Sequence, residues 1–571
     1  MKQVWSYLKY YNKESVLAPL FKLLEVAGEL AVPLIVAAIV DNGIAKGDKG
    51  YIFSMFGLLI AVGAAGLGVA VTAQYFAARA AVGYATRLRR ALFSKMQSLS
   101  FAEVDSLGAA TMIARMTGDV NQVQTGVNMV LRLLLRSPFV VFGAMMMAFT
   151  VDAMAGGVFA AVIAALCLVV GVIMGITLPL YKKTQARQDD LLLSTRENLT
   201  GVRVLRAFCK EEEEISSFDR KNGALQKSQN LVGAVSALMN PLTYVVVNVG
   251  ILVLLYVGAI RVDGGYLKQG EVLALYNYMT QILVELIKLA NLIVTVTKSA
   301  ACASRIQAIF DLHNPLKTSD DRAKKTDNAV DFRHVSLSYN GGGRAREDVD
   351  FSVKKGEVVG IIGGTGSGKS SLVNLIPHFY DADEGEVLVN GVNVQAQDTK
   401  ELRSRVGTVL QKAVLFCGTI RENLQWGNEN ATDEELTRAV AVAQATDVVA
   451  AKGGLDGKIE QGGRNLSGGQ KQRLSIARAL VKKPEILILD DSSSALDYAT
   501  DAALRQAIGS LEDKPTVFIV SQRTASLAHA DKIVVLDEGK TVGIGTHEEL
   551  LQTCSLYREI YDSQYKEVAR G

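Results

Sequence analysis

Eight residues in the second half of the chain have the composition of a phosphate-binding loop. They read Gly-Gly-Thr-Gly-Ser-Gly-Lys-Ser from Gly363 to Ser370, after the apolar run Val358–Ile362 and before a predicted helix that starts near Lys369. Glycines allow backbone N–H groups to curl around phosphate oxygens, the lysine reaches the β and γ phosphates, and the serine hydroxyl ligates Mg²⁺. Because the strand–loop–helix context is the one that this motif requires, we predict a site for ATP and Mg²⁺.

Two downstream segments point to the same chemistry. Asp490 ends the apolar run Ile486–Leu489, where a carboxylate close to Mg²⁺ is expected, and the segment Leu466–Gln470 reads Leu-Ser-Gly-Gly-Gln at the start of the helical run Gln470–Leu480. Glycines and a serine at a helix start suit contact with an anion. A simple helix cap would explain Ser467 alone, but not the whole string beside a phosphate-binding loop.

The elements that must position these motifs are alternating strand-like and helical segments. The chain turns polar after Cys302, which indicates a linker at 313–329, and the run Val330–Tyr339 reads as the first strand of the next domain. We therefore predict an α/β P-loop ATP-binding domain over 330–571, with a largely parallel core sheet.

The first half of the chain has the composition of a membrane domain. Three runs contain no Asp, Glu, Lys or Arg, namely Tyr51–Ala78, Ala153–Tyr181 and Leu231–Ile260. A bilayer core about 30 Å thick needs about 20 helical residues, so each run can cross it. Buried helices of a large soluble protein are the alternative for any one run, but three such runs disfavour it. With three runs interrupted by charges, we predict a polytopic α-helical domain over 1–312 with six spans, at about 16–40, 51–78, 131–151, 153–181, 231–260 and 272–297.

The distribution of Lys and Arg predicts the orientation of the spans. The long segments 79–130 and 182–230 hold a basic cluster, whereas 41–50, 152–153 and 261–271 carry few basic residues. We therefore expect a multi-pass protein of the plasma membrane with its N-terminus and ATP-binding domain in the cytoplasm. The two long segments read as helices that extend beyond the bilayer, either as a solvated stalk or to carry motion to the membrane. The nearly balanced net charge of +3 gives no argument for nucleic-acid binding.

Ionisable residues inside the interrupted spans have two interpretations. Lys22, Glu25 and Glu29 share one helix face, and Glu285 and Lys288 repeat the spacing. Such groups line a polar cavity, or they form structural ion pairs and extend toward the membrane surface. Glu29 and Glu285 are the candidate cavity residues.

These motifs and their order resemble the ABC transporter superfamily, in the half-transporter form of its exporters. The resemblance covers essentially the whole chain, since a six-span domain precedes one cassette. It implies that two cassettes pack head to tail, with each ATP between one P-loop and the other subunit's signature motif. It also implies the following roles: ATP binding by Tyr339, Gly363, Gly364, Thr365, Gly366, Ser367, Gly368, Lys369, Ser370, Ser371, Gln411 and Asp490, with Tyr339 stacked on adenine; Mg²⁺ contact by Ser370 and Gln411; a signature motif at Leu466, Ser467, Gly468, Gly469 and Gln470; and a D-loop at Ser494, Ala495, Leu496 and Asp497.

Two catalytic positions depart from the family pattern. The family's catalytic base, a Glu, is replaced by Asp491, whose side chain is one methylene shorter, and the family's switch histidine is replaced by Gln522. Catalytic placement is sensitive at the level of an ångström, and an amide cannot carry a proton or charge at neutral pH. The two changes together impair one ATP site.

This combination resembles one half of the heterodimeric bacterial ABC exporters, in which one ATP site is competent and the other degenerate. The resemblance implies a second, related half-transporter with an intact base and switch histidine, and a cargo of amphipathic drugs or lipids moved outward across the membrane. Hydrolysis would occur mainly at the site that Leu466–Gln470 completes for the partner. Two alternatives remain open: a regulatory or sensory ATP-binding membrane protein without transport, and a homodimeric exporter with two slow sites.

Overall fold

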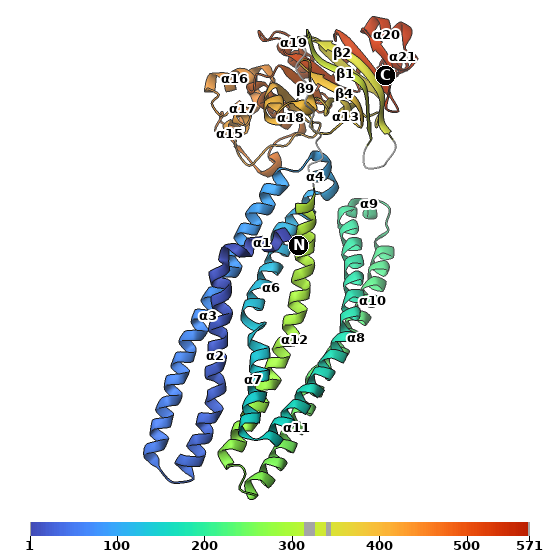
Figure 1. Cartoon of the computed structure of the whole chain (residues 1–571). Helices are drawn as coiled ribbons and strands as arrows, with labels where there is room; N and C mark the ends of the chain where they lie inside the picture. Colours follow the sequence, from blue (N-terminus) through green and yellow to red (C-terminus); the bar gives the residue numbers. More distant parts are fainter. Residues whose placement is uncertain (1, 313–325, 339–343, 569–571) are drawn as a thin grey trace. The chain divides into compact units, whose positions relative to one another are not determined.

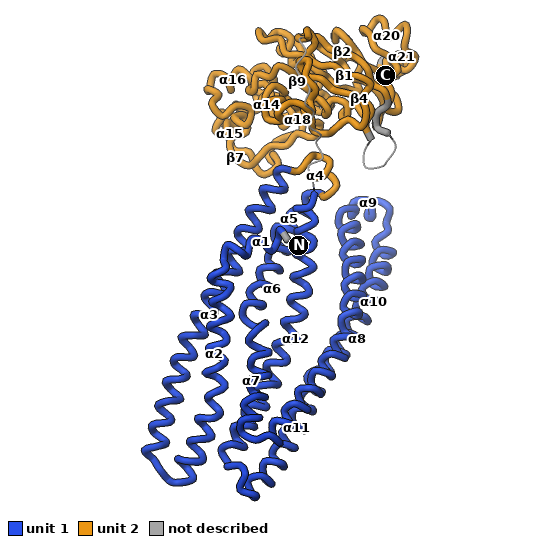
Figure 2. Tube along the Cα trace, in the orientation of Figure 1, with its two compact units in different colours: residues 1–98, 108–312 blue, residues 99–107, 313–571 orange. Residues whose placement is uncertain are grey.

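Long apolar runs and alternating strand–helix runs fold into separate parts of the chain. The structure, a computed structural model, describes residues 2–312, 326–338 and 344–568. It divides into two compact units, residues 1–98 with 108–312 (unit 1) and residues 99–107 with 313–571 (unit 2), coloured separately in Figure 2. The segment 99–107 was expected in the membrane domain but belongs to unit 2. Its Phe101 ring packs there on Phe379.

Unit 1 is entirely helical (Figure 1). Its elements are α1 (Lys2–Ser6), η1 (Tyr7–Tyr11), α2 (Asn12–Ala38), the π-helix η2 (Ile39–Ile44), α3 (Lys49–Gln97), α5 (Ala109–Ala114), the π-helix η3 (Arg115–Asp119), α6 (Val120–Leu133), α7 (Arg136–Val151), α8 (Ala153–Thr200), α9 (Val202–Ala207), α10 (Glu211–Ala237), α11 (Met239–Asp263) and α12 (Gln269–Asp311).

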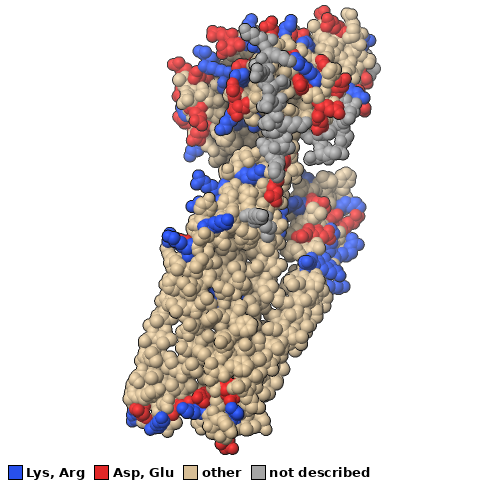
Figure 3. Space-filling view, viewed as in Figure 1, with Lys and Arg blue, Asp and Glu red and all other residues tan. Residues whose placement is uncertain are grey.

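Six helical stretches of unit 1 are long and apolar enough to cross a membrane: Gln3–Ile44, Lys49–Gln97, Ala109–Val151, Ala153–Thr200, Glu211–Asp263 and Gln269–Asp311. The prediction of six spans is confirmed, and each stretch is longer than the predicted span inside it. In Figure 3 the surface of unit 1 is mostly uncharged along the helices, and charged side chains gather where α2 turns into α3 and α11 into α12. An uncharged surface of this length suits lipid tails on its outside.

The interior of unit 1 is formed where the helices pack in pairs. Helix α12 packs against α2, α6 and α7, and α8 packs against α7, α10 and α11. Phe159 and Tyr278 are fully buried in the apolar cluster that joins these helices. The turn between α7 and α8 is a single residue, Asp152, whose Oδ2 accepts from the backbone N–H groups of Met154 and Ala155 at 3.1 and 3.0 Å. This cap satisfies amides at the start of α8 that have no partner within the helix.

Unit 2 contains one ten-stranded sheet flanked by helices, in the order β5-β4-β1-β2-β12-β11-β3-β10-β9-β6 (Figure 1). Its strands are β1 (Asn328–Ser338), β2 (Arg344–Lys354), β3 (Val358–Gly363), β4 (Glu384–Val389), β5 (Val392–Asn393), β6 (Val406–Val409), β9 (Ile486–Asp490), β10 (Thr516–Val520), β11 (Lys532–Asp537) and β12 (Lys540–Gly545), and β7 (Gly418–Thr419) pairs with β8 (Lys458–Ile459). Its helices are α4 (Phe101–Leu107), α13 (Lys369–Val373), η4 (Val394–Ala396), α14 (Thr399–Arg405), α15 (Ile420–Gln425), α16 (Asp433–Val442), α17 (Thr446–Ala451), η5 (Gln461–Gly463), α18 (Gly468–Val481), α19 (Tyr498–Gly509), η6 (Thr524–Ser526), α20 (His547–Thr553) and α21 (Ser555–Val568).

The central strands of this sheet are parallel, as the sequence predicts. Strand β10 pairs in parallel with β3 and β9, and β9 pairs in parallel with β6, whereas β1 is antiparallel to both β2 and β4. Strand β9 is buried on both faces: Leu487 and Leu489 pack into one apolar cluster and Ile486 and Ile488 into the other. Because parallel strands end at one edge, the residues that follow β3, β6, β9 and β10 meet there.

Candidate functional site

The phosphate-binding loop follows β3 at this edge, and its first glycine is required by space. A Cβ on Gly363 would lie 2.1 Å from the backbone O of Leu536 in β11, so no larger residue fits. Gly368, which precedes α13, has φ +82°, in the left-handed region that favours glycine. The Lys369 ammonium bonds back across the loop, donating to the carbonyl O of Gly363 at 2.9 Å and of Gly364 at 2.7 Å. The loop therefore has the cradle and the central cation that a triphosphate needs.

Ser370, a predicted Mg²⁺ ligand, and Asp490, expected close to Mg²⁺, meet across the sheet edge. Ser370 Oγ donates to Asp490 Oδ1 at 2.7 Å, and Asp490, at the end of β9, is 4 % exposed. Burial raises the pKa of the Asp490 carboxyl, Asp491 adds to that rise, and Ser370 and Lys369 oppose it. A hydroxyl and a carboxylate suit a hard cation such as Mg²⁺. Among the described residues no group of three or more His, Cys, Asp or Glu could hold a metal ion, so Mg²⁺ would take further ligands from ATP and water.

The residue at the catalytic-base position is held by its backbone and by a glutamine. Asp491 has φ +44°, rare for a residue other than glycine, and its N–H donates to the backbone O of Val520 at 3.0 Å. Its Oδ2 accepts from Gln411 Nε2 at 3.3 Å, which brings together two residues predicted from the sequence. The carboxylate thus lies beside Gln411, which follows β6 on the far side of β9 from the loop.

The residue at the switch position follows β10 and is fixed through its backbone. The side chain of Gln522 is exposed, and its carbonyl O accepts from Gln564 Nε2 of helix α21 at 2.7 Å. Gln564 Oε1 in turn accepts from the N–H and the hydroxyl of Thr524, both at 2.9 Å. Sequence reasoning missed Gln564, because nothing in its local pattern connects it with a loop about 40 residues earlier.

The signature segment forms the start of α18, as predicted. Ser467 Oγ accepts from Gln470 N at 3.3 Å, and Ser467 N donates to Gln470 Oε1 at 2.9 Å, a reciprocal cap of the helix. Leu466 is buried, whereas Ser467 and Gly468 are exposed. A Cβ on Gly469 would lie 2.8 Å from Ala495 O, so this glycine allows the segment to pack closely on the D-loop.

The D-loop residues connect the helix after them with the switch loop. Asp497 caps α19 by accepting from Thr500 N at 2.9 Å, which together with the Thr500 hydroxyl holds the pKa of its carboxyl below the ordinary value. Arg523 Nη1 donates to Leu496 O at 3.3 Å, and Ser526 Oγ donates to Asp501 Oδ2 at 2.9 Å. Hydrogen bonds thus link the loop after β10 to the D-loop and to helix α19.

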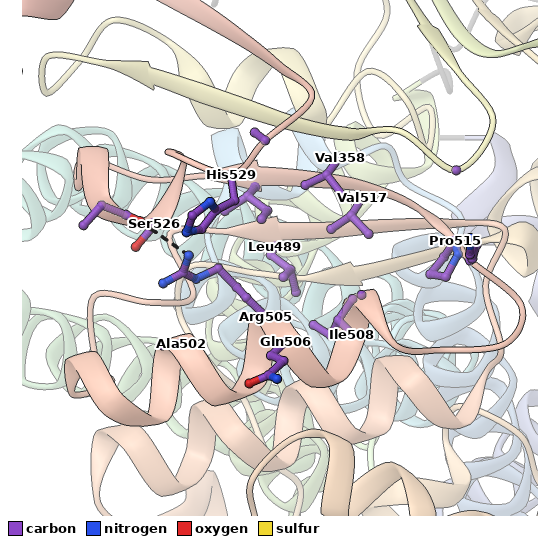
Figure 4. Close-up of a pocket in the computed structure, with 16 residues that line it drawn as sticks. Val358, Leu489, Ala502, Arg505, Gln506, Ile508, Pro515, Val517, Ser526 and His529 are labelled. Atoms are coloured by element: carbon purple, nitrogen blue, oxygen red, sulfur yellow. Dashed lines mark hydrogen bonds between the residues drawn. The ribbon is translucent and has the colours of Figure 1, made fainter. Parts of the chain in front are cut away.

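A cavity of about 580 Å³ lies behind this junction and is separate from the phosphate-binding loop. Figure 4 shows Arg505 and Gln506 of α19 on one side of it and Val358, Leu489 and Val517 of the sheet on the other. None of the predicted ATP-binding residues that the structure describes lines it.

Helix α4 packs in unit 2 although it comes from the first half of the chain. The Phe101 ring stacks on Phe379 with centroids 4.2 Å apart, and the Tyr380 hydroxyl donates to Asp105 Oδ2 at 2.7 Å. The Arg403 guanidinium also lies over the Phe379 ring, 5.0 Å from its centroid. Sequence reasoning missed these aromatic residues, because they come from segments about 280 residues apart.

Three other residues that were predicted to contact ATP or cargo are Tyr339, Glu29 and Glu285. Tyr339, predicted to stack on adenine, lies outside the described residues. Of the candidate cavity carboxylates, Glu285 is 3 % exposed and accepts from Arg136 at 2.6 Å, and Glu29 accepts from the same guanidinium at 2.8 Å. Both carboxylates bind the Arg136 guanidinium, and neither is among the residues that line the two pockets next to Lys22.

Comparisons with known proteins agree with this geometry. The family model "ABC transporter transmembrane region" matches residues 15–286, and the model "ABC transporter" matches residues 346–494. The chain is 33 % identical over 567 residues to the uncharacterized ABC transporter ATP-binding protein YfiB of Bacillus subtilis (strain 168), covering 99 % of both chains. It is 30 % identical over 600 residues to the putative multidrug export ATP-binding/permease protein YgaD of the same organism, again covering 99 % of both. Among solved structures, a bacterial Atm1-family ABC exporter with ATP bound has the same fold, with a TM-score of 0.82 at 23 % identity over 97 % of this chain and 98 % of that one.

Proposed function

Because the chain belongs to the ABC transporter family, as a half-transporter of the exporter type with an ATP-hydrolysing domain, we propose that it works as one half of a heterodimeric exporter. In this proposal the chain's own ATP site is degenerate, and its signature segment completes the competent site of a related partner. The observation that carries the proposal is that Asp491 and Gln522 replace the base and the switch histidine beside an intact Leu466–Gln470.

The position of Asp491 supports slow hydrolysis at the chain's own site. Its backbone N–H is bound to Val520 O at 3.0 Å, and a shift of the chain that made up the missing methylene, about 1.5 Å, would stretch this bond. A misplacement of about 1 Å can cost about 100-fold in rate. The 3.3 Å contact with Gln411 also occupies one carboxylate oxygen that would otherwise orient water.

The position of Gln522 supports the same conclusion. Its carbonyl is bound by Gln564, so only the exposed amide side chain can extend toward a γ-phosphate. An amide can donate a hydrogen bond to phosphate, but it neither transfers a proton nor carries a positive charge. Lys369, Ser370 and Asp490 would still bind ATP with Mg²⁺, which supplies charge neutralisation at the phosphates.

The signature segment is suited to act on another subunit. Ser467 and Gly468 are exposed, and Ser467 Oγ serves as an acceptor in its helix cap, which leaves its hydroxyl proton available to an outside phosphate. The partner would then supply the P-loop, a Glu and a His. Closure of the two cassettes on ATP would turn the membrane cavity outward, and hydrolysis at the partner's site would reset it.

The cargo we propose is amphipathic, such as drugs or lipids, moved outward across the plasma membrane. The six spans and the similarity to a putative multidrug export protein support this class. The N-terminus and unit 2 would lie in the cytoplasm, where ATP is available and where the basic segments 79–130 and 182–230 favour placement.

The experiment compares ATP hydrolysis by the purified full chain, in lipid nanodiscs and without a partner, with that of the Asp491→Glu/Gln522→His variant. We expect slow hydrolysis by the natural sequence and an increase of about 100-fold or more in the variant, since a restored general base contributes about 10²- to 10⁴-fold. Adding Ser467→Ala to the variant should abolish the gain, because two copies must lend each other the signature serine.

Two outcomes would favour the alternatives. Hydrolysis by the natural chain alone on the order of 10 s⁻¹, an ordinary enzymatic turnover, would indicate a homodimeric exporter. Vesicles that contain the chain with its partner and hydrolyse ATP, but move neither a fluorescent lipid nor an amphipathic dye, would indicate a regulatory or sensory protein.

A further inference from the structure

Four cationic side chains converge on one pocket inside unit 1. The pocket measures about 340 Å³ and is lined by Lys22 of α2, Met129, Arg132 and Leu133 of α6, Arg136 of α7 and Lys288 of α12. The cations come from four helices that are separated by up to 266 positions along the chain, so only the fold brings them together.

Three carboxylates lie against this cluster and neutralise most of it. Lys22 pairs with Glu25 at 2.5 Å, Arg136 pairs with Glu29 at 2.8 Å, and Lys288 pairs with Glu285 at 2.7 Å. Each carboxylate turns toward its cation, and none of the three lines the pocket. Four positive groups therefore face three negative ones, which leaves one positive charge in excess.

Arg132 is the cation without a carboxylate among the described residues. It is half-buried, and its Nε is buried without a hydrogen-bond partner there. A guanidinium has five N–H donors in a planar fork that matches carboxylate and phosphate oxygens. Since charged groups at membrane depth are costly when unpaired, the pocket is well suited to receive an anion.

An apolar pocket adjoins the cationic one. It measures about 460 Å³ and is lined by Lys22 together with Ala70, Val71, Gln74, Tyr75 and Ala78 of α3. Lys22 thus belongs to both pockets. A molecule that placed a negative group near Arg132 would have its apolar part beside the Ala70–Ala78 face.

The depth of the pair of pockets suits a molecule taken from one leaflet. Lys22 lies six residues inside the predicted span 16–40, which is about 9 Å along a helix that rises 1.5 Å per residue. Arg132 and Arg136 lie similarly close to the same end of the span 131–151. This level lies in the half of the hydrocarbon core that is nearer the side where we place unit 2.

We propose that these two pockets bind an amphipathic anion, with its phosphate or carboxylate at Arg132 and its apolar body against α3. The inference rests on the proposed export function and gives the charge of the cargo. The same chemistry is found in an acidic phospholipid and in a soluble organic anion, and the experiment separates these sources.

The test measures binding to the full chain in phosphatidylcholine nanodiscs without nucleotide. The probes are radiolabelled dodecyl phosphate and phosphatidylglycerol, with dodecyltrimethylammonium as the cationic comparison. We expect the anions to bind and the cation not to compete. Tight binding of phosphatidylglycerol alone would identify a lipid as the source, and tight binding of dodecyl phosphate alone a soluble anion. Equal binding of anion and cation would overturn the proposal.

Variants of single residues localise the site. Arg132→Gln should weaken anion binding about tenfold, the equivalent of one charge-assisted hydrogen bond, whereas Arg132→Lys should retain most of it. The matched control is Lys298→Gln, which removes an exposed cation of α12 that lines neither pocket. Glu29→Gln should strengthen anion binding severalfold, because it removes a carboxylate that competes for Arg136. This variant tests the site even where an arginine variant fails to fold.

Unchanged binding in both Arg132→Gln and Glu29→Gln would overturn the proposal. Because nucleotide and partner are absent from this assay, its failure leaves the heterodimer proposal standing. A failure of the heterodimer proposal would likewise leave the binding result unaffected.

Discussion

Removing the negative charge of Glu285 should loosen the membrane domain at its most connected ion cluster. Glu285 Oε1 accepts from Arg136 Nη1 at 2.6 Å and from Lys288 Nζ at 2.7 Å, and Oε2 accepts from Ser137 Oγ at 2.9 Å. The side chain is only 4 % exposed, so water cannot replace these bonds. The cluster joins α7 to α12, and in Glu285→Gln the guanidinium faces a neutral amide.

The size of the effect follows from the partners that remain. Breaking a buried ion pair costs about 3–5 kcal/mol, because one charge is left without compensation. Arg136 would keep Glu29 at 2.8 Å, and Lys288 is 41 % exposed and can be hydrated, so we expect the lower end, about 3 kcal/mol. For a unit of this size, about 2 °C per kcal/mol gives a midpoint lowered by about 6 °C.

The assay is thermal unfolding of the full chain in detergent, followed by intrinsic fluorescence at one scan rate. The matched control is Glu212→Gln, which neutralises an exposed carboxylate of α10 and should change the midpoint by less than about 1 °C. A midpoint for Glu285→Gln that equals that of the control would refute the claim that this cluster joins α7 to α12.

Three further predictions concern unit 2. Since burial raises the pKa of Asp490 and we expect the ionised carboxylate beside Mg²⁺, the affinity for Mg²⁺ with ATP should fall on acidification at a pH above the ordinary value of about 3.9; an unchanged Mg²⁺ titration down to pH 4 would contradict this. Phe101→Ala should remove the stacking on Phe379, about 1 kcal/mol beyond the lost buried area, and increase hydrogen exchange in 99–107; unchanged exchange there would argue against this packing. Gln564→Ala should release three hydrogen bonds and increase exchange at Gln522–Thr524, whereas exposed Gln552→Ala should leave that loop unchanged; equal exchange in both variants would rule out the tether.

Much of the fold could be predicted because local patterns determine it. An uncharged run such as Ala153–Tyr181 predicts a span because it is long enough to cross a bilayer. In the structure this run is part of the longer helix α8, Ala153–Thr200. The P-loop and Asp490 could be placed together because each stands at the carboxyl end of a strand of a parallel sheet, whereas Gln411 was placed only through the family resemblance.

The remaining features depend on contacts between distant segments. The spacing of Glu285 and Lys288 left a cavity lining and an ion pair open, and Arg136, which also binds Glu285, comes from a helix about 150 residues earlier. The packing of Phe101 on Phe379 likewise joins residues that no local periodicity connects. In both cases the two partners lie too far apart along the chain for a local pattern to connect them.

In the proposed mechanism this chain retains its ATP largely uncut while its partner carries out most of the hydrolysis. The most direct measurement is photolabelling of the complex during turnover with 8-azido-ATP that carries a label on either the α or the γ phosphate. We predict that both labels are recovered on this chain, with Lys369→Ala as the control that removes both, and that only the α label is recovered on the partner. Recovery of the α label without the γ label on this chain would contradict the account.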